Sequence, residues 1–229
     1  MKAILLAAGF GTRLRPLTDN IPKCLVPIKG KPLLEIWLEK LSNSGINDIV
    51  INTHYLSGVV SQFICKSKYK DNIFLTFESN LLGTAGTVNK VLKIIDQKED
   101  ILLVHADNYC LDDLVEFIEY HNNRPKECLM TMMTFKCDTP KNYGIVKINE
   151  KNVLINFFEK KENINEGNIA NAAIYILSVE FLEIMQEKYK NSFDFSNDII
   201  PYFLNKIYVY QSKKLIVDIG TIENYNKYK

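Results

Sequence analysis

The sequence has little net charge, few cysteines and no long apolar run. It contains 28 Lys+Arg and 27 Asp+Glu, so it lacks the basic excess with which proteins bind nucleic acid or an anionic membrane. No apolar run approaches the roughly 20 residues that a membrane span needs. The five cysteines are scattered, without a C-x-x-C pair, which argues against a disulfide framework and a zinc ribbon. We therefore expect a cytoplasmic protein with no nucleic-acid or membrane partner.

The remaining composition is that of a globular protein. Hydrophobic residues make up 47% and charged residues 24% of 229 residues, and neither an internal repeat nor a low-complexity linker interrupts them. A single domain over residues 1–229 is expected, with a change of pattern near residue 128.

Short apolar runs alternate with helical patterns in the first part, residues 1–127. Strands are expected at 3–7, 49–52, 74–77 and 101–105, because β-branched and leucine-rich runs between helices are typical of β-α-β units. Helical spacing of apolar residues predicts four core-facing stripes. These are Leu34/Trp37/Leu38/Leu41, Leu56/Val59/Val60/Phe63/Ile64, Val88/Val91/Leu92/Ile95 and Leu111/Leu114/Val115/Ile118.

The second part, residues 128–229, has longer alternating runs. Runs at 129–135, 143–148, 153–158 and 169–177 favour mixed or antiparallel strands, and helices are expected at 179–185 and 196–204 before a tyrosine-rich tail. The expected fold class is a Rossmann-like α/β fold. Its mixed, mostly parallel sheet is flanked by helices and carries a smaller lobe on the same domain.

A glycine-rich turn follows the first strand. Gly9 and Gly11 allow positive φ and close approach of a ligand to backbone N–H groups, and Arg13 lies beside them. The turn lacks both the third glycine of a dinucleotide fingerprint and a Walker ending. Prolines at 16, 22 and 27 should keep the chain extended and fix Lys23. Two fixed cations suit a triphosphate that loses pyrophosphate, although a lone G-x-G is more often only a tight turn.

Two solitary aspartates are candidate magnesium ligands. Asp107 and Asp218 each close an apolar run, so both are expected at carboxyl ends of strands, where α/β sheets bind ligands. Mg²⁺ prefers one or two carboxylates together with substrate phosphates. Either residue alone is more often a turn or helix-cap aspartate. The three histidines lack metal-ligand spacing.

Residues 5–18, from Leu5 to Thr18, followed by Pro22-Lys23, resemble the signature of sugar-1-phosphate nucleotidyltransferases. The resemblance implies that Arg13 and Lys23 hold the phosphates of a nucleoside triphosphate and that Asp107 and Asp218 bind Mg²⁺. These four are the expected catalytic residues. The expected products are a nucleotide-activated sugar and pyrophosphate. The glycine-rich segment would bind the nucleotide through Leu6, Ala7, Ala8, Gly9, Gly11 and Thr12.

Residues 78–87 are similar to the base-recognition segment of that family, with Gly83 and Thr84 expected near the nucleotide. Glu78 would face the base. An ionised carboxylate only accepts hydrogen bonds, which favours the ring N–H of guanine, uracil or thymine over adenine or cytosine. An exposed strand-end glutamate is the alternative interpretation.

The second part carries motifs similar to those with which the family binds the sugar phosphate. Lys160 would neutralise the attacking phosphate, although a solvated lysine is the commoner situation. Where the family has proline and glycine, this chain has Lys161 and Ala173, which leaves the local loop shape open. The expected sugar-phosphate residues are Tyr143, Gly144, Glu159, Lys160 and Asn171, with Asp107 and Asp218.

The motif combination is most similar to mannose-1-phosphate and heptose-1-phosphate guanylyltransferases. It favours GTP as the partner nucleotide and implies a role in nucleotide-sugar synthesis for cell-surface polysaccharides. UTP- or dTTP-dependent transfer to another hexose or amino-sugar 1-phosphate stays open, as does a homodimer. A glycosyltransferase would normally carry Asp-x-Asp, but Asp107-Asn108-Tyr109 stands here. A non-catalytic nucleotide-binding homologue would be expected to lose one of the four charged residues.

Overall fold

The computed structural model describes residues 1–160 and 166–229, and the chain forms two compact units. Unit 1 consists of residues 1–81, 104–111 and 216–229, and unit 2 of residues 82–103 and 112–215. Each unit therefore combines segments that are distant in the sequence. Residues 82–103 of the earlier part of the sequence belong to unit 2, and residues 216–229 at the end of the sequence belong to unit 1.

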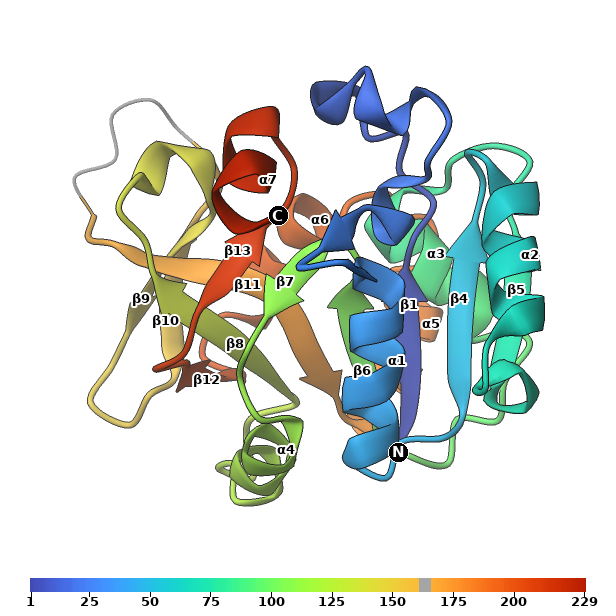
Figure 1. Ribbon diagram of the computed structural model, residues 1–229. Coiled ribbons are helices and arrows are strands. Elements are labelled where there is room, and N and C mark those ends of the chain that lie inside the picture. Colours follow the sequence, from blue (N-terminus) through green and yellow to red (C-terminus); the bar gives the residue numbers. More distant parts are fainter. Residues whose placement is uncertain (161–165) are drawn as a thin grey trace. The chain divides into compact units, whose positions relative to one another are not determined.

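Unit 1 is built on parallel strands. They are β1 (Lys2–Leu6), β4 (Ile49–Thr53) and β5 (Ile73–Phe77); β1 pairs with β4 and β4 with β5, all in the same direction (Figure 1). Every residue of β4 is buried, as expected for a strand covered on both faces. These strands confirm the predicted ones to within two residues.

Helix α1 (Leu33–Asn43) buries the predicted stripe Leu34/Trp37/Leu38/Leu41. The indole of Trp37 donates a hydrogen bond to the carbonyl oxygen of Asn108, at 2.8 Å, which ties α1 to β7 (Asn108–Cys110). In α2 (Ser57–Lys66) only Val60 and Ile64 are buried, so the predicted stripe there is narrower than expected.

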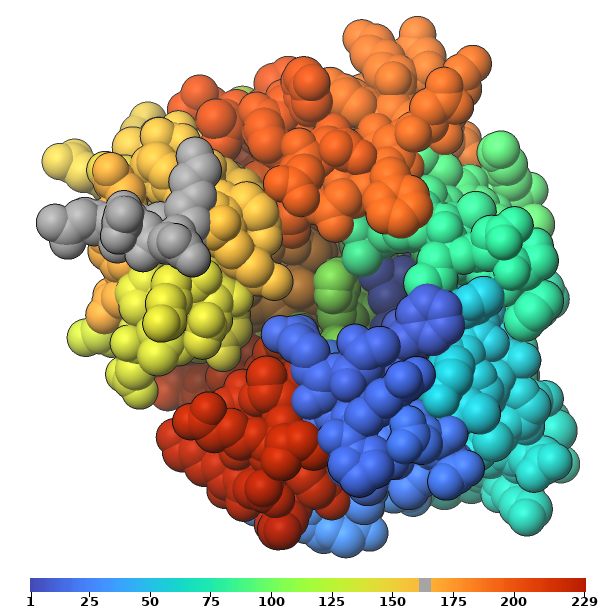
Figure 2. Space-filling model, turned by 90° about the horizontal axis from the view of Figure 1, so that it is seen from above, coloured from blue at the N-terminus to red at the C-terminus, as the bar shows by residue number. Residues whose placement is uncertain are grey.

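The other elements of unit 1 are short. An apolar cluster of Ile28, Leu33, Tyr109, Val217 and Ile219 holds them together. In Figure 2 the N-terminal segment (blue) and the C-terminal segment (red) of this unit lie side by side at the surface. The remaining elements are β2 (Pro27–Ile28), β3 (Lys31–Pro32), β13 (Ile216–Asp218), α7 (Ile222–Tyr228) and 3-10 helices at Thr12–Leu14, Leu17–Asp19, Lys23–Leu25 and Lys70–Asn72.

Unit 2 contains mainly antiparallel strands, as the alternating runs predicted. β11 pairs antiparallel with β8 and β9, and β9 with β10, while β12 pairs parallel with β8. The strands are β8 (Met130–Lys136), β9 (Ile145–Ile148), β10 (Leu154–Phe158), β11 (Ile169–Leu177) and β12 (Ile207–Gln211). β6 (Ile101–His105) begins in unit 2 and ends in unit 1.

The helices of unit 2 correct two expectations. Helix α4 (Leu114–Asn122) begins after Leu111, because Asp113 caps it by accepting a hydrogen bond from the Val115 N–H, and Leu111 and Val115 are exposed. The helix expected at 196–204 is split into α6 (Phe195–Asp198) and a 3-10 helix (Ile200–Phe203), since Pro201 has no N–H to continue α6. The others are α3 (Gly83–Val91), α5 (Val179–Lys188) and a 3-10 helix (Pro140–Asn142).

The tyrosine-rich tail contains regular secondary structure. β12 lies within it, and α7 follows β13. The predicted α/β class is confirmed. Among the described residues, no helix combines the length and apolar character that crossing a membrane requires.

Candidate functional site

The carboxyl ends of the three parallel strands of unit 1 lie level with one another. Leu6 of β1 is opposite Asn52 of β4, and Thr53 of β4 is opposite Phe77 of β5. The Ala7 N–H donates a hydrogen bond to Asn52 Oδ1 at 2.7 Å, and Asn52 Nδ2 donates to Glu78 Oε1 at 2.9 Å. The start of the glycine-rich turn is therefore held by a buried side-chain relay.

This relay changes the interpretation of Glu78. The residue is 2% exposed, so it is not the exposed strand-end glutamate of the alternative interpretation. Its carboxylate orients Asn52, which is not among the predicted site residues. The signal was present, because Asn52 interrupts an apolar strand run at its carboxyl end in the same way as Asp107.

Gly11 lies in the left-handed region, with φ of 64°. A Cβ at this position would lie 3.0 Å from Thr18 Cγ2 and 3.2 Å from Lys23 Cβ. The turn thus packs directly against the backbone end of Lys23, and a side chain at residue 11 would push the two apart. Within the same turn Ala7 and Ala8 are buried, whereas Gly9 and Thr12 are exposed.

The proline-rich stretch was predicted to be extended, and this prediction is wrong. Short 3-10 helices follow Gly11, Pro16 and Pro22, and Lys23 begins the last of them. Proline fixes its own φ near a value that a 3-10 turn also uses, so it is compatible with either conformation. Lys23 is nevertheless held in place, since its side chain is only 12% exposed.

The four predicted charged residues converge in unit 1. Lys23 Nζ contacts Asp107 Oδ2 and lies 3.3 Å from Asp218 Oδ1. Arg13 Nη2 lies 3.8 Å from Asp218 Oδ2. Asp107 and Asp218 therefore face one amino group, with the more exposed guanidinium of Arg13 beside them.

Pairing of two short strands brings the aspartates together. β7, which follows Asp107, pairs antiparallel with β13, so Asn108 is opposite Asp218. The Ile219 N–H also donates to the Asp107 carbonyl oxygen at 3.2 Å. At Gly220 a Cβ would lie 2.7 Å from an oxygen of Asp218 and 2.9 Å from Arg13 Nη2. Glycine there leaves room for the two side chains to meet.

The charges at this site shift one another's protonation. Burial by itself would lower the pKa of Lys23, but the charges of Asp107 and Asp218 outweigh it and raise that pKa. Burial would raise the pKa of Asp107, whereas Lys23 and His105 hold it below its ordinary value. Burial and the Asp107 charge raise the pKa of Cys24 to about 12, so this neighbouring thiol stays protonated at neutral pH.

The donor set fits a magnesium ion. Asp107 Oδ2 and Asp218 Oδ1 both reach one amino group, so both can reach one ion, and Mg²⁺ commonly takes one or two carboxylates while substrate and water complete its shell. Over residues 1–160 and 166–229, no group of three or more His, Cys, Asp or Glu side chains offers a fuller cage.

Gly83 and Thr84 belong to unit 2, where both contact the segment that leads into α6. A Cβ on Gly83, whose φ is 73°, would lie 2.2 Å from the Phe193 carbonyl oxygen. That oxygen accepts a hydrogen bond from the Ala85 N–H at 3.0 Å, and Thr84 Oγ1 accepts one from the Phe195 N–H at 2.7 Å. Packing within unit 2 therefore accounts for glycine at residue 83 without a ligand.

The predicted sugar-phosphate motifs of unit 2 lie on neighbouring strands. The Asn171 N–H donates to the Gly144 carbonyl oxygen at 2.8 Å, and Asn171 Nδ2 donates to Tyr175 Oη at 2.6 Å. A Cβ on Gly144 would lie 3.0 Å from Glu159 Oε2. Gly144, Glu159 and Asn171 thus form one polar group.

Glu159 and Lys160 follow directly after β10 in the sequence. Burial raises the pKa of Glu159, although the neighbouring charge of Lys160 opposes the shift. Lys160 is exposed, and Lys161, where the family has proline, lies outside the described residues. Ala173, where the family has glycine, has φ of 52°, a conformation that an alanine adopts only at a cost.

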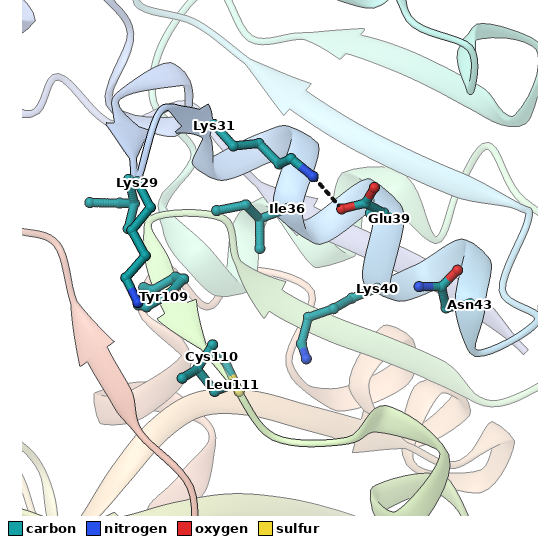
Figure 3. A pocket seen from close by; sticks show the side chains of 10 residues that line it. Lys29, Lys31, Ile36, Glu39, Lys40, Asn43, Tyr109, Cys110 and Leu111 are labelled. Atoms are coloured by element: carbon teal, nitrogen blue, oxygen red, sulfur yellow. Dashed lines mark hydrogen bonds and ion pairs between the residues drawn. The ribbon is translucent and has the colours of Figure 1, made fainter. Parts of the chain in front are cut away.

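A separate cavity of unit 1, of about 280 Å³, contains none of the predicted site residues. Lysines line it, and Figure 3 shows Lys31 turned toward Glu39, with which it forms an ion pair at 2.6 Å. Tyr109 of β7 forms part of its wall, so the cavity is next to the strand that follows Asp107.

Comparisons with known proteins show the family and the fold of the chain. The family described as nucleotidyl transferase matches residues 2–229. The chain is 30% identical to the mannose-1-phosphate guanylyltransferase catalytic subunit beta of Dictyostelium discoideum over 96% of its own length and 61% of that protein. It is also 30% identical to a mannose-1-phosphate guanyltransferase of Pichia angusta, again over 96% and 61%. The chain thus spans about three fifths of the length of these relatives.

Two solved structures are similar in fold to this chain over nearly its full length. HddC from Yersinia pseudotuberculosis is 27% identical and superposes with a TM-score of 0.82 over 99% of this chain and 97% of that chain. A second structure of HddC, complexed with GMP-PN, gives a TM-score of 0.81 with the same identity and coverage.

Proposed function

The chain belongs to the nucleotidyl transferase family, and we propose that it transfers a nucleotidyl group from a nucleoside triphosphate to a sugar 1-phosphate, with release of pyrophosphate. One observation carries the proposal. Asp107 and Asp218, far apart in the sequence, meet around Lys23 directly beneath the glycine-rich turn. Such a collection of charges suits a bound polyphosphate better than a tight turn in a structural protein.

The cations of unit 1 would act on the leaving group. Arg13 is 63% exposed, so its guanidinium is free to move onto the phosphates of an incoming nucleotide. Lys23 begins a short 3-10 helix whose backbone packs against Gly11. Because the backbone of Lys23 is fixed there, its ammonium group would also reach the phosphates. Once they contact the phosphates, both would stabilise the negative charge that develops on the departing pyrophosphate, because cations already in place need little rearrangement during the reaction.

Asp107 and Asp218 would hold a magnesium ion. When bound, the ion neutralises phosphate charge and aligns the reacting oxygens. The attacking group is already a phosphate anion, so the proposed in-line displacement at the α-phosphorus requires neither a general base nor a covalent enzyme intermediate.

Unit 2 would bind the sugar 1-phosphate. Glu159 and Asn171 carry the oxygen and nitrogen atoms that bind sugar hydroxyls. Both lie beside Gly144, since the Asn171 N–H donates to its carbonyl oxygen and a Cβ on it would lie 3.0 Å from Glu159 Oε2. Lys160, exposed shortly after the end of β10, would neutralise charge on the acceptor phosphate.

GTP with a mannose- or heptose-type sugar 1-phosphate is the proposed substrate pair. Its support is the names of the relatives from D. discoideum and P. angusta and the GMP-PN bound to HddC. Glu78 gives weaker support for a guanine base, because its carboxylate already accepts a hydrogen bond from Asn52 inside the protein. UTP or dTTP with another hexose or amino-sugar 1-phosphate is the alternative that the same experiment tests.

The test is a matrix of GTP, UTP, dTTP, ATP and CTP against a panel of sugar 1-phosphates, with pyrophosphate release as the readout. We expect release with GTP and mannose 1-phosphate or a heptose 1-phosphate, and strong loss of it in Asp107→Asn. A glycosyltransferase or a nucleotide-binding protein without turnover would release none with any pair. That outcome would reject the proposed function.

A further inference from the structure

Lys23 holds the position at which the two aspartates would bind a divalent ion. Its Nζ contacts Asp107 Oδ2 and lies 3.3 Å from Asp218 Oδ1, in a side chain that is 12% exposed. Two carboxylates facing each other repel unless a cation lies between them. In this structure that cation is the ammonium group of the protein itself.

We propose that Lys23 is a tethered counter-ion that competes with the divalent metal for Asp107 and Asp218, so that the metal site opens only when Lys23 turns away. The inference rests on the proposed function in one respect: the triphosphate is the anion that would draw Lys23 from the aspartates. It adds a second task for Lys23, besides stabilising the leaving pyrophosphate.

The geometry requires competition. Mg²⁺ binds carboxylate oxygens at about 2.0–2.1 Å, and an ammonium in contact with the same oxygens would lie against the ion with a charge of the same sign. Lys23 has limited room to step aside, because its Cβ lies beneath Gly11 and its neighbours Cys24 and Leu25 are buried. It therefore needs another anion within reach before it leaves the aspartates.

Two consequences follow. Without nucleotide, a divalent ion must break an ion pair with two carboxylates, so the protein binds it weakly. With nucleotide, the phosphates receive the ammonium and the metal takes its place, so the two ligands favour each other's binding. Charge at the site stays balanced in both states, which avoids exposing a pair of facing carboxylates.

The test measures Mn²⁺ binding alone, in the absence of nucleotide, by isothermal titration calorimetry. We expect Lys23→Met to bind Mn²⁺ about tenfold or more tightly than the wild type, within the usual range for coupled sites. Lys23→Arg keeps the charge and should bind as weakly as the wild type. Lys31→Met is the matched control, because Lys31 pairs with Glu39 at 2.6 Å outside this site, and its Mn²⁺ affinity should be unchanged.

A second variant and a second measurement keep the test decisive if Lys23→Met fails to fold. Lys23→Gln fills similar space without charge and should show the same gain in affinity, and Mn²⁺ should raise the Tm of both uncharged variants but not that of the wild type. Adding Asp107→Asn to Lys23→Met should remove the gain. Equal Mn²⁺ affinity in wild type and in folded Lys23→Met or Lys23→Gln would overturn the proposal.

The outcomes separate this inference from the proposed function. If no substrate pair releases pyrophosphate while the Mn²⁺ affinities follow the expected order, the reaction is wrong and the competition is right. If pyrophosphate is released but Lys23→Met and the wild type bind Mn²⁺ alike, the reaction is right and the competition is wrong.

Discussion

At the scale of single residues, Arg13 and Lys23 carry the same charge in different surroundings. Arg13 is 63% exposed and lies 3.8 Å from Asp218, whereas Lys23 is 12% exposed and contacts both aspartates. An exposed ion pair at that distance contributes little to folding. Arg13 is therefore available to a ligand at almost no cost in stability, while removal of Lys23 leaves two carboxylates without their shared partner.

Arg13→Ala should lower kcat by about 10² to 10³, as removal of other preorganised charge stabilisers does, and change the free energy of unfolding by less than about 0.5 kcal/mol. Steady-state pyrophosphate release and urea unfolding measure the two effects. Arg15→Ala is the control, because Arg15 lies in the same segment but pairs with Asp19 at 3.2 Å. If both variants turned over at the same rate, the role given to Arg13 would be wrong.

Ala173→Gly should stabilise the protein by about 0.5 kcal/mol. Relief of the left-handed conformation at φ of 52° is worth roughly 1–2 kcal/mol, and the extra freedom of glycine in the unfolded chain offsets about 0.4–1 kcal/mol of it. Urea unfolding measures the difference. Ala172→Gly, at a buried neighbour without positive φ, should destabilise instead. The assignment of strain to residue 173 fails if both changes have the same sign.

At the scale of elements, the site depends on strand ends. β1, β4 and β5 end level with one another, which places Ala7, Asn52 and Glu78 in one hydrogen-bonded row. β7 and β13 pair over a few residues and thereby bring the aspartates together. Pairing among β1, β4 and β5 thus positions the glycine-rich turn, and pairing of β7 with β13 positions the carboxylates. A substitution can disturb either set of strands without the other.

Asn52→Ala should destabilise the protein by about 1–3 kcal/mol, because it leaves the buried Ala7 N–H and the Glu78 carboxylate without this partner. It should also raise the KM for the nucleotide more than it lowers kcat, since the relay positions the turn and does not touch the reacting atoms. Asn47→Ala, at an exposed asparagine of the same unit, is the control for both measurements. An Asn52→Ala protein with wild-type stability and KM would show that the relay does not hold the turn.

At the scale of the whole molecule, the ion pair between Lys23 and Asp107 links folding to pH. The pKa of Asp107 is lowered in the folded state, so the unfolded chain binds more protons between the folded value and the ordinary one near 3.9. The stability from Asp107 is therefore present in full above that ordinary pKa and is lost as the pH falls through the folded one. The raised pKa of Lys23 gives the opposite window, with stability lost only as the pH rises through a value above 10.5.

Asp107→Asn should lower the free energy of unfolding at pH 7 by about 1.5–3 kcal/mol, the range for hydrogen bonds to charged groups. The difference from wild type should shrink toward zero as the pH falls below the folded pKa of Asp107, because a protonated carboxyl then resembles the amide. Urea unfolding of both proteins between pH 3 and pH 7 measures it. A difference that stayed constant over this range would exclude the proposed linkage.

The amino-acid sequence alone predicts the longer strands, most of the helices and the charged residues of the candidate site. Apolar runs identified β1, β4, β5, β6 and β11 because burial of a strand depends on its own side chains. It did not determine where helices start, since a cap such as Asp113 overrides the apolar spacing of Leu111 and Val115. It also did not predict the 3-10 helices around Lys23, because proline allows those turns as readily as extended chain.

Which side chains meet depends on the folded arrangement of the strands. Asp107 and Asp218 come together through the pairing of β7 with β13, an interaction between short strands that carry no pattern of their own. The same holds for Asn52, whose role depends on Ala7 and Glu78 from other strands. Local sequence specifies local conformation and burial, whereas the contact between a lysine and two distant carboxylates exists only after the backbone has brought them within a few ångströms.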